Sequence, residues 1–79
     1  MKLSYHPQHN VAYISLKDKP EEVETIRVSD ELNIDMAPDG TIYGIELLNA
    51  NTQLSANGHA ELIIVNEASG RSSTVPLAG

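Results

Sequence analysis

Apolar and polar residues alternate along much of the chain with a period of two. The pattern over residues 2–6 and 11–16 is typical of two β-strands that each present one apolar face. The four-residue turn between them sets a register that pairs Leu3 with Ile14, so both strands bury the same face. The start of the chain therefore predicts an antiparallel hairpin.

Two further strands are predicted after a charged connector. Residues 17–22 hold Pro20 among charged side chains, and this composition disfavours a strand. Residues 23–29 regain β character, and residues 32–36 alternate cleanly between apolar and polar side chains. We expect the second of these strands to have one face in water.

The strongest local signal is a turn that follows residue 36. It is carried by three residues: Pro38, Asp39 and Gly40. Proline presets φ for a turn, and Asp-Gly is a common hairpin dipeptide. A two-residue loop pairs Met36 with Tyr43, whereas a three-residue loop places Gly40 in a bulge and shifts the pairing. The apolar pattern favours the first register, Pro38 favours the second, and a bulge near Gly44 reconciles them.

A short helix is predicted in the middle of the chain. Residues 48–57 are less β-like, and Asn49 or Asn51 is a candidate N-cap residue. Asn57 and Gly58 supply a helix stop. A helix of this length is stable only when it packs on the rest of the fold.

The last third of the chain predicts one more pair of strands. Residues 61–66 contain the continuous apolar run Leu62–Val65, which is typical of a strand buried on both faces. Residues 67–70 turn the chain. Residues 72–77 return as an edge strand, since Pro76 cannot donate to a ladder.

These elements predict a mainly β fold in a single domain over residues 1–79, with a β-rich α+β fold as the alternative. We expect one antiparallel meander sheet of six or seven short strands, twisted or partly rolled, with at most one short helix near residues 49–57. A compact chain of 8.6 kDa has a folded surface of roughly 4,700 Å². In a chain of this size, the free energy gained by burying apolar surface about equals the conformational-entropy cost of ordering the residues. We therefore expect a homodimer that adds burial, rather than a monomer of modest stability.

Composition and charge exclude several classes of protein. Eleven acidic against five basic residues give a net charge of −6, which disfavours binding to a phosphate backbone, so no nucleic-acid partner is expected. The chain has no cysteine, which excludes disulfides and cysteine-bound metal clusters. No apolar run reaches the ~18–20 residues of a membrane span, and the N-terminus lacks the apolar segment of a signal peptide. We expect a cytoplasmic protein without a membrane partner.

Candidate chemistry is sparse, and neither an enzyme nor a bound cofactor is expected. The chain contains no glycine-rich phosphate loop and no nucleophile elbow. His6 and His9 have the spacing of metal ligands, but Pro7 disfavours a helix there and no third ligand is apparent. Two solvated turn histidines are therefore expected. A small-ligand or metal-binding module built on the His6–His9 turn is the alternative function.

The acidic residues offer a docking surface for a basic partner. They are concentrated in the charged connector and around the central turn. The candidate interaction surface comprises six residues: Glu21, Glu22, Glu24, Asp30, Glu31 and Asp35. Clustered carboxylates steer a basic protein toward its docking site. The ordinary alternative is that these side chains only keep strand faces and turns solvated.

Three segments of the chain resemble a known protein family. They are Tyr5-His6-Pro7 followed by residues 12–16, then residues 28–35, and then residues 39–50 with the sequence DGTIYGIELLNA. Together they resemble the small bacterial proteins grouped as domain-of-unknown-function family 2283, over about residues 1–50. The most specific segment is residues 39–50. Where the family places aspartates in the first turn, this chain has His6 and Asn10.

The resemblance implies a small, mainly β fold without an assigned biochemical activity. It also implies genes that lie beside those of small toxin-like proteins, and hence an antitoxin-like role. Together with the reading of the residues, it predicts a non-catalytic protein-interaction module. This module is expected to act as a homodimer, as an acidic antitoxin-like partner of a basic protein, or as both.

Overall fold

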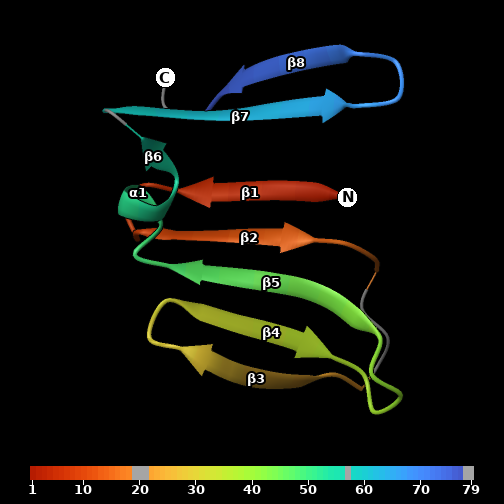
Figure 1. The fold of residues 1–79 in the computed structure, drawn as a ribbon. Helices are drawn as coiled ribbons and strands as arrows, with labels where there is room; N and C mark the ends of the chain where they lie inside the picture. Colours follow the sequence, from red (N-terminus) through yellow and green to blue (C-terminus); the bar gives the residue numbers. More distant parts are fainter. Residues whose placement is uncertain (19–21, 57, 78–79) are drawn as a thin grey trace.

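The computed structural model describes residues 1–18, 22–56 and 58–77 and places most of them in antiparallel strands. Five strands form one sheet in the order β1-β2-β5-β4-β3 (Figure 1). They are β1 (Lys2–His6), β2 (Val11–Ser15), β3 (Glu24–Ser29), β4 (Leu32–Met36) and β5 (Ile42–Leu48). The rest of the chain forms a second, three-stranded unit with one short helix: α1 (Ala50–Gln53), β6 (Ser55–Ala56), β7 (His59–Asn66) and β8 (Arg71–Pro76). The prediction of a mainly β, antiparallel fold is confirmed.

The first hairpin has the register that its apolar pattern predicts. Leu3 pairs with Ile14 and Tyr5 pairs with Ala12. The turn between the strands places Asn10 at a φ of 56°, a conformation that asparagine tolerates better than most residues. Alternation and turn length were therefore sufficient to fix this register.

The strand order differs from a simple meander at one place. β2 pairs with β5 rather than with β3, and Ile14 lies opposite Ile45 in this pairing. The charged connector after β2 carries the chain to the far edge of the sheet, from which β3, β4 and β5 return to β2 (Figure 1). Part of this connector, residues 19–21, lies outside the described residues. The strands are thus divided between two sheets, and β5 joins the two halves of the larger one.

The central turn combines both of the registers considered from the sequence. The N–H of Gly40 donates to the carbonyl of Ala37 at 2.9 Å, and the N–H of Ala37 donates to the carbonyl of Thr41 at 2.9 Å. The loop therefore has three residues, with Gly40 at a φ of 90°. Met36 pairs with Ile42 and not with Tyr43, so that part of the prediction is wrong.

A one-residue shift in β5 then restores the apolar pairing. It lies between Asp35 and Met36 of β4, and beyond it Ile34 pairs with Ile45 as predicted. The bulge expected near Gly44 is confirmed, because Gly44 lies opposite Asp35 directly after the shift. The turn satisfies Pro38, and the bulge returns the apolar side chains to one face.

The predicted helix is present but much shorter than residues 49–57. Asn49 occupies the N-cap position with a φ of 54°, yet its side chain makes no capping hydrogen bond. The helix ends at Gln53 and the chain continues directly into β6. Asn57 lies outside the described residues, and Gly58, with a φ of 79°, stands between β6 and β7 rather than at a helix end. The expected helix stop is therefore wrong, because the chain has already resumed β structure.

The five-stranded sheet has one apolar and one polar face, since residues that are paired across strands share a face. The apolar face comprises Leu3, Tyr5, Ala12, Ile14, Ile26, Leu32, Ile34, Ile45 and Leu47. The polar face comprises Ser4, Tyr13, Ser15, Thr25, Arg27, Asn33, Asp35, Gly44 and Glu46. Among the described residues, β6, β7 and β8 make at most isolated contacts with this sheet, whereas α1 contacts β2. The buried apolar residues of the described chain are three alanines: Ala12, Ala37 and Ala50.

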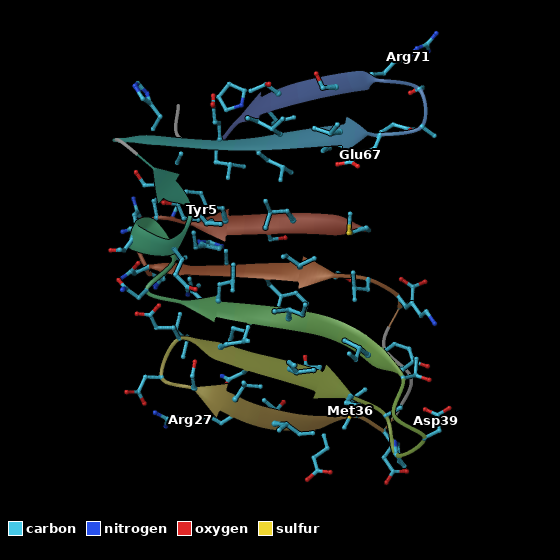
Figure 2. The ribbon with its side chains drawn as sticks, in the orientation of Figure 1. Tyr5, Arg27, Met36, Asp39, Glu67 and Arg71 are labelled. Atoms are coloured by element: carbon cyan, nitrogen blue, oxygen red, sulfur yellow. The ribbon has the colours of Figure 1, made fainter. Side chains whose placement is uncertain are left out.

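The β7–β8 hairpin extends beyond β1, away from the rest of the sheet (Figure 1). Figure 2 shows Glu67 and Arg71 at its tip, on the opposite side of β1 from Arg27 and Met36. The side chains of Ile63, Ile64 and Val65 are 56%, 53% and 54% exposed. The expectation that this strand is buried on both faces is wrong for the single chain, because no other described element packs over it.

Within the described residues, no helix is long and apolar enough to cross a membrane.

Candidate functional site

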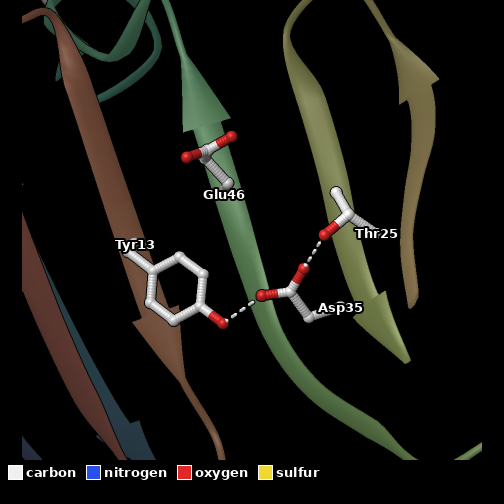
Figure 3. A pocket seen from close by; sticks show the side chains of 4 residues that line it. All are labelled: Tyr13, Thr25, Asp35 and Glu46. Carbon is white, nitrogen blue, oxygen red and sulfur yellow. Dashed lines mark hydrogen bonds between the residues drawn. The ribbon is translucent and has the colours of Figure 1, made fainter. Parts of the chain in front are cut away.

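A hydrogen-bonded cluster occupies the polar face of the five-stranded sheet (Figure 3). The Tyr13 hydroxyl, from β2, donates to Oδ2 of Asp35 on β4 at 2.6 Å. The Thr25 hydroxyl, from β3, donates to Oδ1 of Asp35 at 2.7 Å. Asp35 is only 9% exposed, and each of its carboxylate oxygens accepts a bond from a hydroxyl. This is the arrangement that a carboxylate needs when it is withdrawn from water.

Gly44 makes the approach of Tyr13 to Asp35 possible. The tyrosine ring crosses β5 where a Cβ on Gly44 would stand 1.9 Å from the Tyr13 Oη and 2.4 Å from its Cζ. Any side chain at this position would displace the ring. A glycine inside a strand often marks such a close approach, and this is the signal in the sequence that could have revealed the cluster.

Glu46 adds a second carboxylate beside the cluster. Asn33 Nδ2 donates to its Oε1 at 2.9 Å, and Glu46 is the strand partner of Tyr13. Tyr13, Thr25, Asp35 and Glu46 line an open pocket of about 450 Å³. The lining consists of two carboxylates, a phenol and an alcohol, and these groups are bonded to one another or to Asn33. The cluster thus links four strands across the polar face, a role that the sequence did not predict for Tyr13 or Thr25.

Of the predicted histidine pair, His6 ends β1 and His9 lies in the turn that leads to β2. The rings of His6 and His9 meet edge to face, with centroids 5.4 Å apart and an interplanar angle of 71°. Both residues are exposed. Among the described residues, no group of three or more His, Cys, Asp or Glu side chains is placed to hold a metal ion. The turn therefore brings two imidazoles together without further ligands from that part of the chain.

The predicted acidic surface is divided among separate places. Glu22 and Glu24 are exposed at the start of β3, and Glu21 lies outside the described residues. Asp30 forms an exposed ion pair with Arg27 at the other end of that strand. Glu31, next to it, accepts a bond from Asn49 Nδ2 at 3.3 Å.

Asp35 is separate from these acids, because it lies in the polar-face cluster and is nearly buried. The five described residues of the predicted acidic surface therefore do not form a single patch, and Glu21 lies outside the described residues. Alternation along the strand placed Asp35 on the polar face, but only the fold shows that hydroxyls cover it.

The predicted turn residues are structural. Pro38, Asp39 and Gly40 form the loop between β4 and β5. The Thr41 N–H donates to Asp39 Oδ1 at 2.9 Å. This bond, followed by one from the Thr41 side chain, holds the pKa of the Asp39 carboxyl below its ordinary value of 3.8. The aspartate thus stabilises the loop mainly in its ionised form.

Helix α1 is fastened to the first turn by a network of amides. The Tyr5 hydroxyl donates to Asn51 Oδ1 at 2.7 Å, and the Asn51 N–H donates to Asn10 Oδ1 at 2.8 Å. Asn51 Nδ2 also donates to the carbonyl of Pro7 at 3.0 Å. On its other side, Gln53 Nε2 donates to the carbonyl of Glu31 at 3.0 Å. These bonds fix the point at which the chain leaves the five-stranded sheet.

Comparison with known proteins supports a family but no activity. The model of the family described as "Protein of unknown function (DUF2283)" matches residues 2–51 of the 79-residue chain. The matched segment contains all five strands of the larger sheet and ends just inside α1, so the β7–β8 hairpin lies outside it. No curated protein and no solved structure matches the chain significantly.

Proposed function

This chain belongs to the DUF2283 family of proteins of unknown function, and we propose that it is a non-catalytic, cytoplasmic protein-interaction module that acts as a homodimer. The observation that carries the proposal is the apolar face of the five-stranded sheet, whose large side chains are only half-buried in the single chain. A row of aliphatic side chains crosses all five strands of this face: Leu3, Ile14, Ile45, Ile34 and Ile26. A contiguous apolar surface of this kind on a small protein marks an interface.

The surface area of the chain supports this interface. The single chain exposes 5930 Å², against roughly 4,700 Å² for a compact protein of the same mass. Its radius of gyration is 14.1 Å, against about 11.6 Å for a compact domain of this length. The excess of about 1,200 Å² is more than the ~800 Å² that each partner buries in a standard interface. Each chain therefore exposes enough additional surface for a second copy to bury in a stable dimer.

The polar face supports a structural role for its carboxylates. A catalytic acid or base needs a group poised for proton exchange with a substrate. Here both carboxylates of the pocket accept bonds from neighbouring side chains. These bonds hold the strands in place, so we assign the function to the surfaces of the sheet and not to the pocket.

The net charge of −6 favours a basic protein as an additional partner of the dimer. Glu22 and Glu24, exposed together at the start of β3, are the acids best placed to meet it. Capture of partners by the full chain from its native host, followed by mass spectrometry, tests this part. We expect a basic protein that is released as salt screens the charges. Recovery of no basic protein would contradict it.

Light scattering tests the homodimer directly. We expect the purified chain at micromolar concentration to have twice the 8.6 kDa mass of one copy. A mass of 8.6 kDa throughout the accessible concentration range would overturn the proposal.

A matched pair of variants then locates the interface. Ile14 and Ser15 are neighbours on β2 whose side chains point to opposite faces of the sheet. We expect Ile14→Lys to shift the mass toward the monomer and Ser15→Lys to leave the dimer intact. Circular dichroism checks that both variants keep their strands. Equal loss of the dimer in both variants would place the interface elsewhere.

A further inference from the structure

The β7–β8 hairpin is an apolar element without a partner in its own chain. Leu62, Ile64 and Val75 lie on one of its faces, and Ile63 and Val65 lie on the other. Within the described residues, β7 makes extended contacts with β6 and β8, and its contacts with the five-stranded sheet are at most isolated. A two-stranded hairpin in water is marginally stable alone, so this one needs a covering surface.

The chain's own apolar face is not that surface, because the exit of the hairpin is fixed. Asn51 and Gln53 bind helix α1 to the first turn and to the carbonyl of Glu31. Ser55 and Ala56 then pair with the start of β7, and the strand runs beyond β1 (Figure 1). The hairpin is thereby held beside its own sheet and not over it.

We propose that the hairpin docks on the apolar face of the five-stranded sheet of a second copy, and that the second copy returns the same contact. This inference rests on the proposed homodimer and names the element that forms it. Exchange of this kind gives a closed twofold assembly in which each copy supplies one hairpin and one face.

The lengths of the hairpin strands and of the sheet strands match. β7 and β8 have eight and six residues, which is about 27 and 20 Å of extended chain. The strands of the larger sheet have five to seven residues, so the two strands of the hairpin are similar in length to the strands that they would cover. The chain exposes about 1,200 Å² more than a compact protein of its mass, which exceeds the ~800 Å² that a standard interface buries on each partner. Apart from His59, the hairpin has three ionisable side chains: Glu61, Glu67 and Arg71. Glu67 and Arg71 lie at its tip (Figure 2).

Cross-linking between two tagged copies tests this contact, because the chain has no cysteine of its own. One copy carries Ile63→Cys or Ile64→Cys in the hairpin, and these are exposed positions that tolerate the change. The other copy carries Ile14→Cys on the apolar face or, as the matched control, Ser15→Cys on the polar face. Leu47→Cys serves as a second position on the apolar face if Ile14→Cys perturbs folding. The linker is a short bis-maleimide that spans the ~10 Å between packed sheets.

We expect one of the two hairpin cysteines to link to Ile14→Cys or Leu47→Cys roughly 100-fold faster than to Ser15→Cys, since docking raises the effective concentration to the millimolar range. A dimer in light scattering without this preference would overturn the inference and leave the homodimer standing. Linking of hairpin to hairpin instead would have the same consequence. A monomer in light scattering would overturn both the inference and the proposed function.

Discussion

At the scale of single residues, Asp35 shows how the sheet tolerates an acid that is nearly excluded from water. An unpaired buried carboxylate is strongly destabilising, but hydroxyl donors compensate for the lost hydration. Tyr13 reaches Asp35 from β2, across β5, and Thr25 reaches it from the neighbouring strand β3. Three residues that are far apart in the sequence therefore act as one polar unit.

The Tyr13 hydroxyl is expected to contribute measurably to stability. Tyr13→Phe removes the bond to Asp35, and hydrogen bonds to charged groups are worth about 1.5–3 kcal/mol. We expect the free energy of unfolding in urea to fall by that amount. Tyr43→Phe is the control, because no hydrogen bond from the Tyr43 hydroxyl is found among the described residues. Equal effects of the two substitutions would show that the bond to Asp35 adds nothing.

The carboxyl of Asp39 predicts a pH dependence of stability. Its folded-state pKa lies below the ordinary value of 3.8, first because of the Thr41 backbone bond and then because of the Thr41 side chain. A lowered pKa gives a stabilisation that is complete above the unfolded pKa and is lost as the pH falls through the folded pKa. We expect the stability advantage of the native chain over Asp39→Asn to disappear as the pH falls below 3.8. Urea unfolding across an acidic pH series measures it, and a pH-independent difference would contradict this origin.

At the scale of elements, β5 decides how the sheet is assembled. It pairs with β2 on one side and with β4 on the other, and the shift at Asp35 and Met36 lets a three-residue loop coexist with the aligned apolar row. The bulge and Gly44 lie in the same short segment of β5, and the fold needs both of them. One strand thus carries the register, the bulge and the space for Tyr13.

Gly44→Ala is expected to disrupt this segment. The new Cβ would stand 1.9 Å from the Tyr13 Oη, so the ring must leave Asp35 or the strand must move. Overpacking of this kind costs about 1–3 kcal/mol in free energy of unfolding. In a Tyr13→Ala background the obstacle is gone, and we expect the same substitution to be close to neutral. A double-mutant cycle measures this coupling, and additive effects would contradict it.

At the scale of the whole molecule, the fold is a single layer with a projecting hairpin. Its extents are 36 × 34 × 19 Å, and its buried apolar residues in the described chain are alanines. The family match covers the five-stranded sheet, whereas the hairpin lies outside it. The family match thus contains the framework of the sheet, and the hairpin, which we propose forms the dimer contact, lies outside it.

A dimer that completes the core makes thermal stability depend on protein concentration. Association stabilises the folded state by mass action, so each tenfold rise in concentration adds about 1.4 kcal/mol for a two-state dimer. We expect the unfolding midpoint to rise with concentration in the native chain and to rise less in Ile14→Lys. Scanning calorimetry over a hundredfold range of concentration measures the shift. A midpoint that does not move would indicate a monomer.

Short-range patterns were sufficient for some of this structure. Alternation gave the β1–β2 register and the two faces of β4, because a period of two fixes the face once a neighbour is known. The turn at Pro38 and Gly40 and the bulge near Gly44 also followed from backbone preferences. The length of α1 did not, because a helix of four residues depends on its contacts and not on its sequence.

The sequence by itself determined the class of fold, the apolar face of each strand and the acidity of the surface, because these depend on neighbouring residues and on composition. Only the tertiary structure decided that β5 joins β2, that Tyr13 crosses Gly44 to reach Asp35, and that the predicted acids lie apart. It also left the apolar run Leu62–Val65 largely exposed, where the sequence predicted burial. The physical reason is that burial is a property of the layers that meet in space, and we propose that a second chain supplies the layer that covers this strand.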